Sequence, residues 1–342
     1  MRLPLLALLS LLAACASLPL VQPLGGQEFL AWGDMPYCRN VADTATCARN
    51  EATTTRLVQA MNRTGVRTAI FVGDTKASQE ACDLFHLVTR PAMLFGAFDG
   101  AMVYALGDND WTDCARPTVA PGGVAPMVAL AQLREAFFPA DRSLGARPIP
   151  LQRPAPRGTG VENARWQEGQ ALFATFNIPG EPAGTSVFPG DRAAMAEIAA
   201  ANLAWLDAAF AEASAKRLPA LVLAFQADLW HPCLMEQHRA SAACWREPKG
   251  RPDGVMRTDN VYDYAGFLQR LAQRSAAFGG QVLLLHGDSH EWREDRNPGD
   301  GQGRAIPNAT RFVVPGEDDM RAVRVRITPG AARVFSFVEV RP

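Results

Sequence analysis

Four Gly-Asp dipeptides follow short apolar stretches of this 342-residue chain, and each places a carboxylate where a strand is expected to end. A single dipeptide of this kind is a common turn, because Gly accepts a positive φ and Asp caps its own backbone. Four of them are expected to converge, because ligands of open α/β sheets bind beyond the carboxyl ends of the strands. They are Gly33-Asp34, Gly73-Asp74, Gly107-Asp108 and Gly287-Asp288, and a fifth stretch ends in Gln226-Ala227-Asp228.

A divalent metal ion is the simplest partner for converging carboxylates. Packed carboxylates repel and raise one another's pKa unless a cation neutralises them. His290 adds an imidazole two residues after Asp288, on the same side of an extended turn. The pattern therefore predicts a metal site, and the alternative is a set of purely structural turn caps.

Five apolar stretches of strand length carry these motifs, at 29–32, 68–72, 102–106, 221–225 and 282–285. They lack polar alternation, which is typical of strands covered on both faces. Helical patterns lie between them at 50–61, 78–88, 191–216 and 263–278, and the second is expected to end near Pro91. Strands that alternate with helices indicate an α/β architecture.

Two segments, 139–160 and 292–307, are rich in turn-forming residues and are expected to be loops within the fold. Near the C-terminus, Val323, Val325 and Ile327 alternate with arginines, and a turn at 328–331 precedes a second strand at 334–340. This pattern predicts a closing antiparallel hairpin.

The order of the motifs resembles that of the calcineurin-like metallophosphoesterases, whose blocks run DxH, GDxx, GNH followed by Asp or Glu, a single His, and GHxH. The corresponding stretches span most of the chain, at 33–37, 73–76, 107–111, 224–228 and 287–290. The resemblance implies a four-layer α/β/β/α sandwich of two mixed sheets flanked by helices. It also implies hydrolysis of a small-molecule phosphomonoester or phosphodiester with two divalent ions.

Carried over position by position, the resemblance implies six metal ligands. Asp34, Asp74 and His290 match ligands of one ion, and Asp74 would bridge to the second. The second-ion positions, where the family has Asn, His and His, hold Asp108, Gln226 and Asp288. A ligand set shifted from nitrogen towards oxygen favours Mn, Mg or Ca over Zn.

Two histidines of the family pattern are replaced. The His of DxH is Pro36, which cannot bind a metal, and the His of GNH, which helps to protonate the leaving group or to hold the phosphate, is Asn109. Because Asn109 cannot act as a general acid, His231 and His286 are the candidates for that role, although His231 also fits a packed loop histidine.

Basic and aromatic residues flank the motifs. Lys76, Arg39 and Arg293 are candidates for binding the substrate phosphate, or they balance surface charge. The tryptophans stack a nucleotide or sugar at the rim of the site, or they fill the loops over the sheet edge; they are Trp32, Trp111, Trp230 and Trp292.

The N-terminus has the pattern of an export signal. Arg2 precedes an apolar stretch at 3–12 that is too short to span a bilayer, and Leu12-Ala13-Ala14-Cys15 resembles the bacterial lipobox. We expect a signal peptide at 1–14, lipidation of Cys15, a tether at 15–27 and one domain at 28–342. By resemblance to Gram-negative lipoproteins, Ala16 in place of Asp favours the outer membrane, so we expect an outer-membrane or periplasmic lipoprotein. The alternative is ordinary secretion with cleavage after Ala14 or Ala16.

Six further cysteines are an even number, which fits disulfides in an exported chain. Their proximity in sequence predicts Cys38 with Cys47 and Cys233 with Cys244, which leaves Cys82 with Cys114. A zinc site of thiolates is the competing hypothesis, but no CxxC pair occurs.

The charge is balanced, with 34 Lys and Arg against 35 Asp and Glu, so nucleic acid is not an expected partner. Two other functions compete with the phosphoesterase. One is a lipoprotein that keeps the fold without catalysis and binds a ligand with its loops. The other is a serine hydrolase that uses Ser289. The sequence has no GxSxG motif, and Asp288 and His290 are direct neighbours of Ser289, whereas a catalytic triad takes its members from separate segments.

Overall fold

A computed structural model of the protein describes residues 26–116, 123–154, 158–180, 188–230 and 264–342. The strands are β1 Gln27–Trp32, β2 Thr68–Phe71, β3 Ala101–Tyr104, β4 Arg165–Glu168, β5 Ala171–Thr175, β6 Ala220–Ala224, β7 Gln281–His286, β8 Arg293–Arg296, β9 Ala309–Val313, β10 Ala322–Ile327 and β11 Phe335–Val340. The helices are α1 Thr44–Arg63, α2 Arg90–Gly96, α3 Pro126–Phe137, α5 Arg192–Ala215 and α6 Tyr264–Ala277, with short turns η1 Phe85–Thr89, η2 Thr112–Ala115 and η3 Pro189–Asp191.

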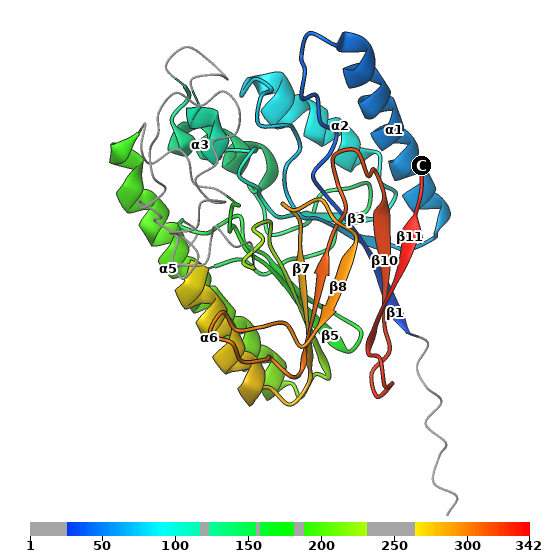
Figure 1. Cartoon of the computed structure of the whole chain (residues 1–342), viewed down its shortest axis with the longest axis vertical. Helices are drawn as coiled ribbons and strands as arrows, with labels where there is room; N and C mark the ends of the chain where they lie inside the picture. Colours follow the sequence, from blue (N-terminus) through cyan, green and yellow to red (C-terminus); the bar gives the residue numbers. More distant parts are fainter. Residues whose placement is uncertain (1–25, 117–122, 155–157, 181–187, 231–263) are drawn as a thin grey trace, which may run out of the picture.

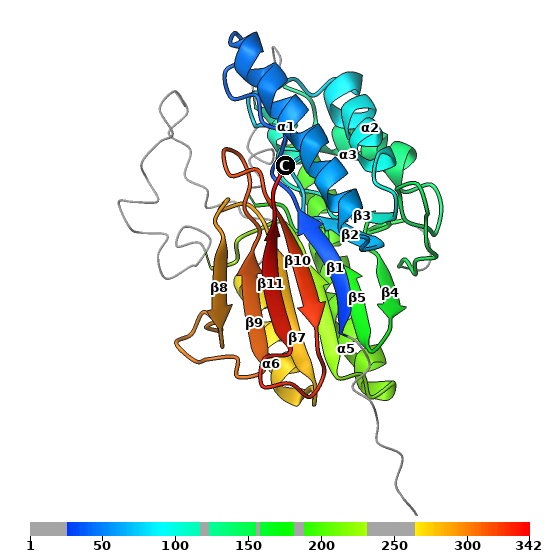
Figure 2. The same ribbon diagram turned by 90° about the vertical axis from the view of Figure 1, so that its right-hand side faces the viewer.

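Two mixed sheets face each other between layers of helices (Figures 1 and 2). The first sheet has the order β11-β10-β1-β2-β3, with β1, β2 and β3 parallel. The second has the order β4-β5-β6-β7-β9-β8, with β5, β6, β7 and β9 parallel. Helices α1, α2 and α3 lie on the first sheet and α5 and α6 on the second. The expected α/β/β/α sandwich is confirmed.

Strand alternation divides the apolar side chains between two cores. In β1, Phe29 and Ala31 join the core between the sheets, whereas Leu30 and Trp32 join the core under the helices. Phe29 meets Phe173 of β5 edge to face, with ring centroids 5.2 Å apart. Because both faces are buried, the central strands need no polar side chains.

Helix α5 covers the second sheet and contacts β5 and β6. Of the described helices it is the one that is long and apolar enough to cross a membrane by length and composition. Its buried side chains, such as Met195, Ile198 and Leu206, show that this apolar character serves the core of the fold.

Two of the predicted helices have different boundaries. Helix α1 begins at Thr44 instead of residue 50, because the Asp43 side chain caps it by accepting the backbone N–H of Thr46 at 3.0 Å. The segment expected to be a helix at 78–88 is a loop until the π-helical turn η1, which continues into α2. Pro91 lies in the first turn of α2 and does not end the helical segment, which continues to Gly96.

The C-terminal hairpin is confirmed, with β10 antiparallel to β11 and Val325 opposite Phe337. The predicted loop at 292–307 was wrong at its start, because Arg293–Arg296 forms the edge strand β8 against β9. Charged residues are common on edge strands, and they concealed this one in the sequence.

Two of the three predicted disulfides are present. Cys38 is bonded to Cys47, and Cys82 is bonded to Cys114. Cys233, Cys244, His231 and Cys15 lie outside the described residues, as does the predicted signal peptide.

Candidate metal centre

The loops after β1, β2, β3, β6 and β7 meet at one end of the two sheets. The backbone N–H of Asp34 donates to Gly73 O at 2.9 Å, and that of Gly287 donates to Gln226 O at 3.2 Å. The N–H of Asp288 donates to the Asp34 carboxylate at 3.2 Å, which joins the first sheet to the second. The structure therefore brings the Gly-Asp motifs together.

The glycines of these motifs let neighbouring loops approach closely, because they have no Cβ atom. Three of the aspartates that follow them adopt a positive φ. A Cβ atom on Gly107 would lie 2.1 Å from Asp74 Oδ1, and one on Gly287 would lie 2.2 Å from Asp34 Oδ2. Asp34, Asp74 and Asp288 have φ values of 53°, 64° and 70°. A positive φ is strained for residues with a side chain, and such strain clusters at functional sites.

His290 lies between two carboxylates. Its Nε2 atom is 3.2 Å from Asp34 Oδ1, and its Nδ1 atom is 2.9 Å from Glu317 Oε2. Burial alone would lower the pKa of His290, but Asp34 and Glu317 raise it to about 9. Glu317 in turn pairs with Arg39, so the predicted substrate residue Arg39 stands at the edge of this site.

Asp74 accepts several hydrogen bonds. Its Oδ2 atom accepts from the Tyr37 hydroxyl and the Asn109 side-chain amide, both at 2.8 Å, and from the Gln226 amide at 3.4 Å. Its Oδ1 atom accepts the Asn109 backbone N–H at 3.0 Å. The Tyr37 hydroxyl is also 3.4 Å from Asp34 Oδ1, so it lies between the two carboxylates.

The carboxylates of this site are buried close to one another. Burial, followed by the charges of neighbouring carboxylates, raises the pKa of Asp74 and Asp108 well above the usual range. Burial also raises the pKa of Asp288 to about 6. The Oδ1 atom of Asp108 is buried, and the residues that the structure describes give it no hydrogen-bond partner. A buried charge without a partner is unfavourable, and a cation would remove the penalty.

Within the described residues, no three His, Cys, Asp or Glu side chains stand close enough to form a ready metal-ligand cluster. Ligand pairs are nevertheless in place, Asp34 with His290 and Asp74 with Gln226. The donor set is mostly oxygen and fits a hard divalent cation. Such an ion would take the place of the Tyr37 hydroxyl as the partner of Asp74. It would also take the place of the proton on the His290 nitrogen that faces Asp34.

His286 is not placed to donate a proton. The ring is fully buried and stacks on Phe225, its Nδ1 bonds Gly287 O at 2.8 Å, and its Nε2 accepts from Arg311 Nε at 2.8 Å. Burial lowers the pKa of His286 to about 4, so the ring is neutral at pH 7. This placement argues against the predicted role of general acid.

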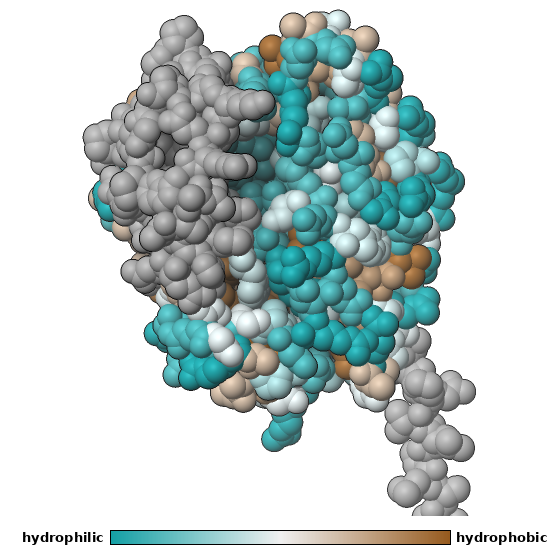
Figure 3. Space-filling model, in the orientation of Figure 1, coloured by the Kyte–Doolittle hydropathy of each residue, from teal (hydrophilic) through white to brown (hydrophobic). Residues whose placement is uncertain are grey.

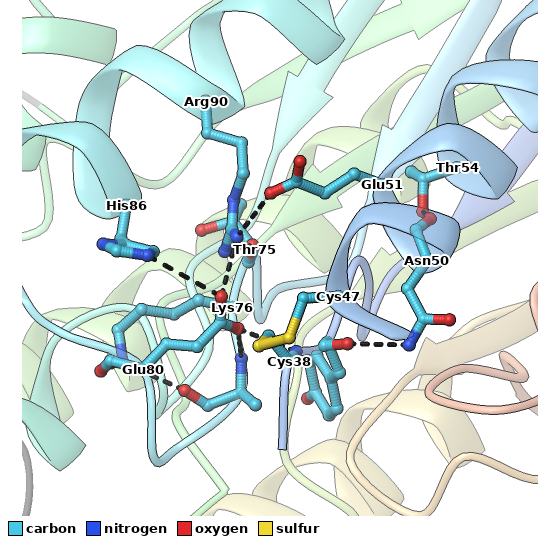
Figure 4. A network of polar contacts seen from close by, with 12 residues as sticks. Cys38, Cys47, Asn50, Glu51, Thr54, Thr75, Lys76, Glu80, His86 and Arg90 are labelled. Atoms are coloured by element: carbon cyan, nitrogen blue, oxygen red, sulfur yellow. Dashed lines mark hydrogen bonds and ion pairs between the residues drawn. A yellow bond between two sulfur atoms is a disulfide. The ribbon is translucent and has the colours of Figure 1, made fainter. Parts of the chain in front are cut away.

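Lys76 is enclosed by the loop that follows Asp74. Its side chain is fully buried, burial lowers the pKa of its ammonium group, and Nζ donates to the carbonyls of Ala77 and Glu80 at 3.2 Å (Figure 4). Glu80 pairs with Arg90 at 2.7 Å, and Arg90 donates to Thr75 O at 2.9 Å. These residues hold the loop that follows Asp74, so burial argues against the substrate-binding prediction for Lys76.

Asp110 was missed in the sequence, although it also shapes this loop. Its carboxylate accepts the backbone N–H groups of Asp74, Thr75 and Gly107 at 2.8 to 2.9 Å. It therefore joins the loops after β2 and β3. The sequence places Asp110 only two residues after Asp108, and nothing in that spacing separates a loop anchor from a ligand.

A buried ion network supports the loop that carries Asp288 and His290. The guanidinium of Arg311 donates to Asp228 at 2.7 Å and to Asp295 at 3.0 Å, and the Ser289 hydroxyl donates to Asp228 at 2.5 Å. Both nitrogens of the nearby His286 have other partners, so Ser289 has no histidine base from that residue. This arrangement argues against the serine hydrolase.

A pH-dependent stability follows from His290 in the metal-free protein. Its pKa is raised from 6.5 to about 9, so the stabilisation is fully present below pH 6.5 and is lost as the pH rises to about 9. We expect the free energy of unfolding in EDTA to fall by up to about 3 kcal/mol over this window. Urea unfolding at several pH values measures it, and an unchanged slope in His290→Gln would rule out this origin.

Tyr37→Phe should separate the metal-free from the metal-bound state. Loss of the hydroxyl leaves Asp74 with one donor fewer, and we expect the metal-free protein to lose about 1–3 kcal/mol. The stabilisation by added Mn should increase, because the hydroxyl no longer occupies the space between Asp34 and Asp74. Tyr264→Phe, which removes a bond to Pro179 O, is the control for losing a buried phenol. An equal Mn effect in both variants would contradict the expectation.

No family model matches this chain, and no curated protein matches it. Among solved structures it is similar to the crystal structure of a dimetal phosphatase from Danio rerio, with 12% sequence identity and a TM-score of 0.46. The match covers 93% of this chain and 99% of the other. At this level the similarity carries no information on what the present chain binds.

Proposed function

We propose that the protein is a metal-dependent phosphoesterase that hydrolyses a phosphomonoester or phosphodiester outside the cytoplasm. The observation that carries the proposal is the set of buried carboxylates on the joined loops of both sheets, including an oxygen of Asp108 without a partner. Mutual repulsion and burial make this set unfavourable without a cation. Paired-cation sites serve phosphate esters in phosphatases and nucleases, where the two ions stabilise the attacking and leaving oxygens.

In this proposal, Asp34, Asp74 and His290 would hold one ion. Asp74 would also serve the second ion, together with the ligands that the resemblance implies, Asp108, Gln226 and Asp288. Mn, Mg or Ca suits these mostly oxygen donors better than Zn. When bound, two such ions lower the pKa of water and stabilise charge on the phosphoryl oxygens.

The protein's own residues orient this chemistry. His290 must be neutral to bind a metal through Nε2, and its Nδ1–H would then donate a hydrogen bond to Glu317, which fixes the ring. The side chain of Asn109 can donate a hydrogen bond to a phosphoryl oxygen, but it cannot supply a proton to the leaving group. We therefore expect faster hydrolysis of esters whose leaving group is already acidic, such as aryl phosphates.

Location outside the cytoplasm is part of the proposal. The lipobox-like stretch that ends in Cys15 supports export and a lipid anchor in the outer membrane or periplasm. Two disulfides support an oxidising compartment, because such bonds are rare in the cytosol.

The test is hydrolysis of 4-nitrophenyl phosphate and bis(4-nitrophenyl) phosphate by residues 16–342, purified with the disulfides intact. The protein is stripped with EDTA and then supplied with Mn, Mg, Ca or Zn. We expect no turnover in EDTA and recovery with Mn or Mg. Failure of every metal to give turnover, in protein whose circular dichroism shows that it is folded, would reject the phosphoesterase.

A binding lipoprotein of the same fold is the second candidate. The observation that favours it is the set of hydrogen bonds from Tyr37, Asn109 and Gln226, which satisfies Asp74 without a metal. This candidate predicts that the folded protein stays metal-free and inactive, and that Tyr37→Phe does not increase its affinity for Mn.

A further inference from the structure

A cavity of about 340 Å³ opens beside the candidate metal centre. Its lining includes Asp228, Trp230, Ser289, Glu291, Arg293 and Arg311. Asp228, which lines the cavity, donates its backbone N–H to Asp288 Oδ2 at 3.0 Å, so the cavity adjoins the loop that carries Asp288 and His290. The described part of the face in Figure 3 is mostly hydrophilic. Most of the residues that line the cavity are charged or polar.

The charges of the lining disfavour a second anionic group. Asp228, Glu291 and Asp295 supply three carboxylates, against two guanidinium groups from Arg293 and Arg311. Arg311 is 3% exposed and is held by Asp228 and Asp295. The exposed Glu291 carboxylate can accept from the hydroxyls of a neutral ligand, and Arg293, which pairs with Asp295 and is 52% exposed, can donate to them.

Trp230 gives the cavity a rigid apolar surface. Its indole N–H donates to Gly299 O at 2.8 Å, and the Arg311 guanidinium lies 4.8 Å from the centre of its ring. The other tryptophans beside the motifs do not line the cavity. Trp32 and Trp111 are fully buried, and Trp292 packs on Phe312.

We propose that this cavity binds the polyol part of the substrate, so that the substrates are phosphate esters of a monosaccharide or a similar neutral polyol. The inference rests on the proposed phosphoesterase function. Hydroxyl groups match the mixed carboxylates and guanidinium groups, and the apolar face of a sugar matches Trp230. The volume lies at the small end of the range for ligand pockets, which suits one sugar ring better than a nucleotide or a lipid.

Two variants of the lining test this assignment in the full Mn-loaded protein. We expect Trp230→Leu and Glu291→Gln to lower kcat/KM for glucose 6-phosphate about 10- to 100-fold. The same variants should lose much less kcat/KM for phenyl phosphate, which has no polyol, so the ratio of the two substrates should change. Glu197→Gln, which changes an exposed glutamate on α5, is the matched control.

The outcomes separate this inference from the proposed function. In one outcome, the wild type and both variants hydrolyse phenyl phosphate while kcat/KM for glucose 6-phosphate and for phenyl phosphate falls by the same factor. That result would reject the polyol site and leave the phosphoesterase proposal intact. If no ester is hydrolysed, saturation-transfer NMR with free glucose decides the cavity alone. Signals that disappear in Trp230→Leu would support the polyol site, and absence of signals in the wild type would overturn it.

Discussion

Asp74→Asn should reduce kcat for 4-nitrophenyl phosphate by at least about 1,000-fold in the presence of Mn. Asp74 would contribute to both ions, and metal ions at a phosphoryl group are worth several kcal/mol, with each 1.36 kcal/mol equal to a factor of ten in rate. Asn preserves the size of the side chain but removes its charge. Steady-state kinetics measure the loss, and calorimetric titration with Mn should show weaker binding.

The matched control for this variant is Asp99→Asn, which changes an exposed aspartate in the turn before β3. We expect its kcat and Mn affinity to equal those of the wild type. If Asp74→Asn also retained wild-type turnover and Mn affinity, the assignment of the metal centre would be wrong.

Arg311→Met should lower the free energy of unfolding by about 3–5 kcal/mol, which is the cost of leaving one partner of a buried ion pair alone. Asp228 and Asp295 both lose their guanidinium partner in this variant. The loop with Asp288 and His290 should loosen as well, because Ser289 is bonded to Asp228. Urea unfolding monitored by tryptophan fluorescence measures the change.

Arg296→Met is the control for Arg311→Met, since Arg296 lies on the neighbouring strand β8 with its side chain 56% exposed. Substitution at such an exposed position usually changes stability by no more than about 0.5 kcal/mol. Equal losses in both variants would show that the Asp228 network contributes little to the fold.

The central strands could be predicted because burial on both faces leaves an uninterrupted apolar sequence. The stretches at 29–32 and 282–285 each lie within a strand, and the stretch at 221–225 coincides with β6 up to Ala224. Strand β4 has the sequence RWQE and β8 has REDR, so neither has the apolar pattern of a central strand. Such strands are defined by the neighbour they pair with, β5 and β9 respectively, and that pairing is not visible in a local pattern.

The sequence predicted the site residues that directly follow a strand. It did not predict the side chains that reach the site from other parts of the chain. The Gly-Asp pattern located Asp34, Asp74 and Asp288 in one region. Tyr37 lies only three residues after Asp34, but its hydroxyl reaches Asp74 on another loop. Glu317 follows His290 by 27 residues and meets it because β9 runs beside β7. These contacts depend on tertiary structure.

Lys76 was predicted to bind the substrate, but the structure gives it other partners. Its spacing after Asp74 suggested a residue that contacts the substrate, but the turn at 77–80 places two carbonyl groups around its ammonium group. The sequence contained Glu80 and Arg90, which fix that turn. Their pairing across ten residues gave no local signal.

The most direct test of the metal centre is a crystal structure of the protein grown with Mn, with anomalous scattering measured near the manganese edge. We expect an anomalous peak between Asp34 and Asp74, with Tyr37 displaced from Asp74 and His290 turned onto the ion. A map without a peak, in which the Tyr37 hydroxyl still lies between the two carboxylates, would contradict the account and leave the binding lipoprotein as the remaining candidate.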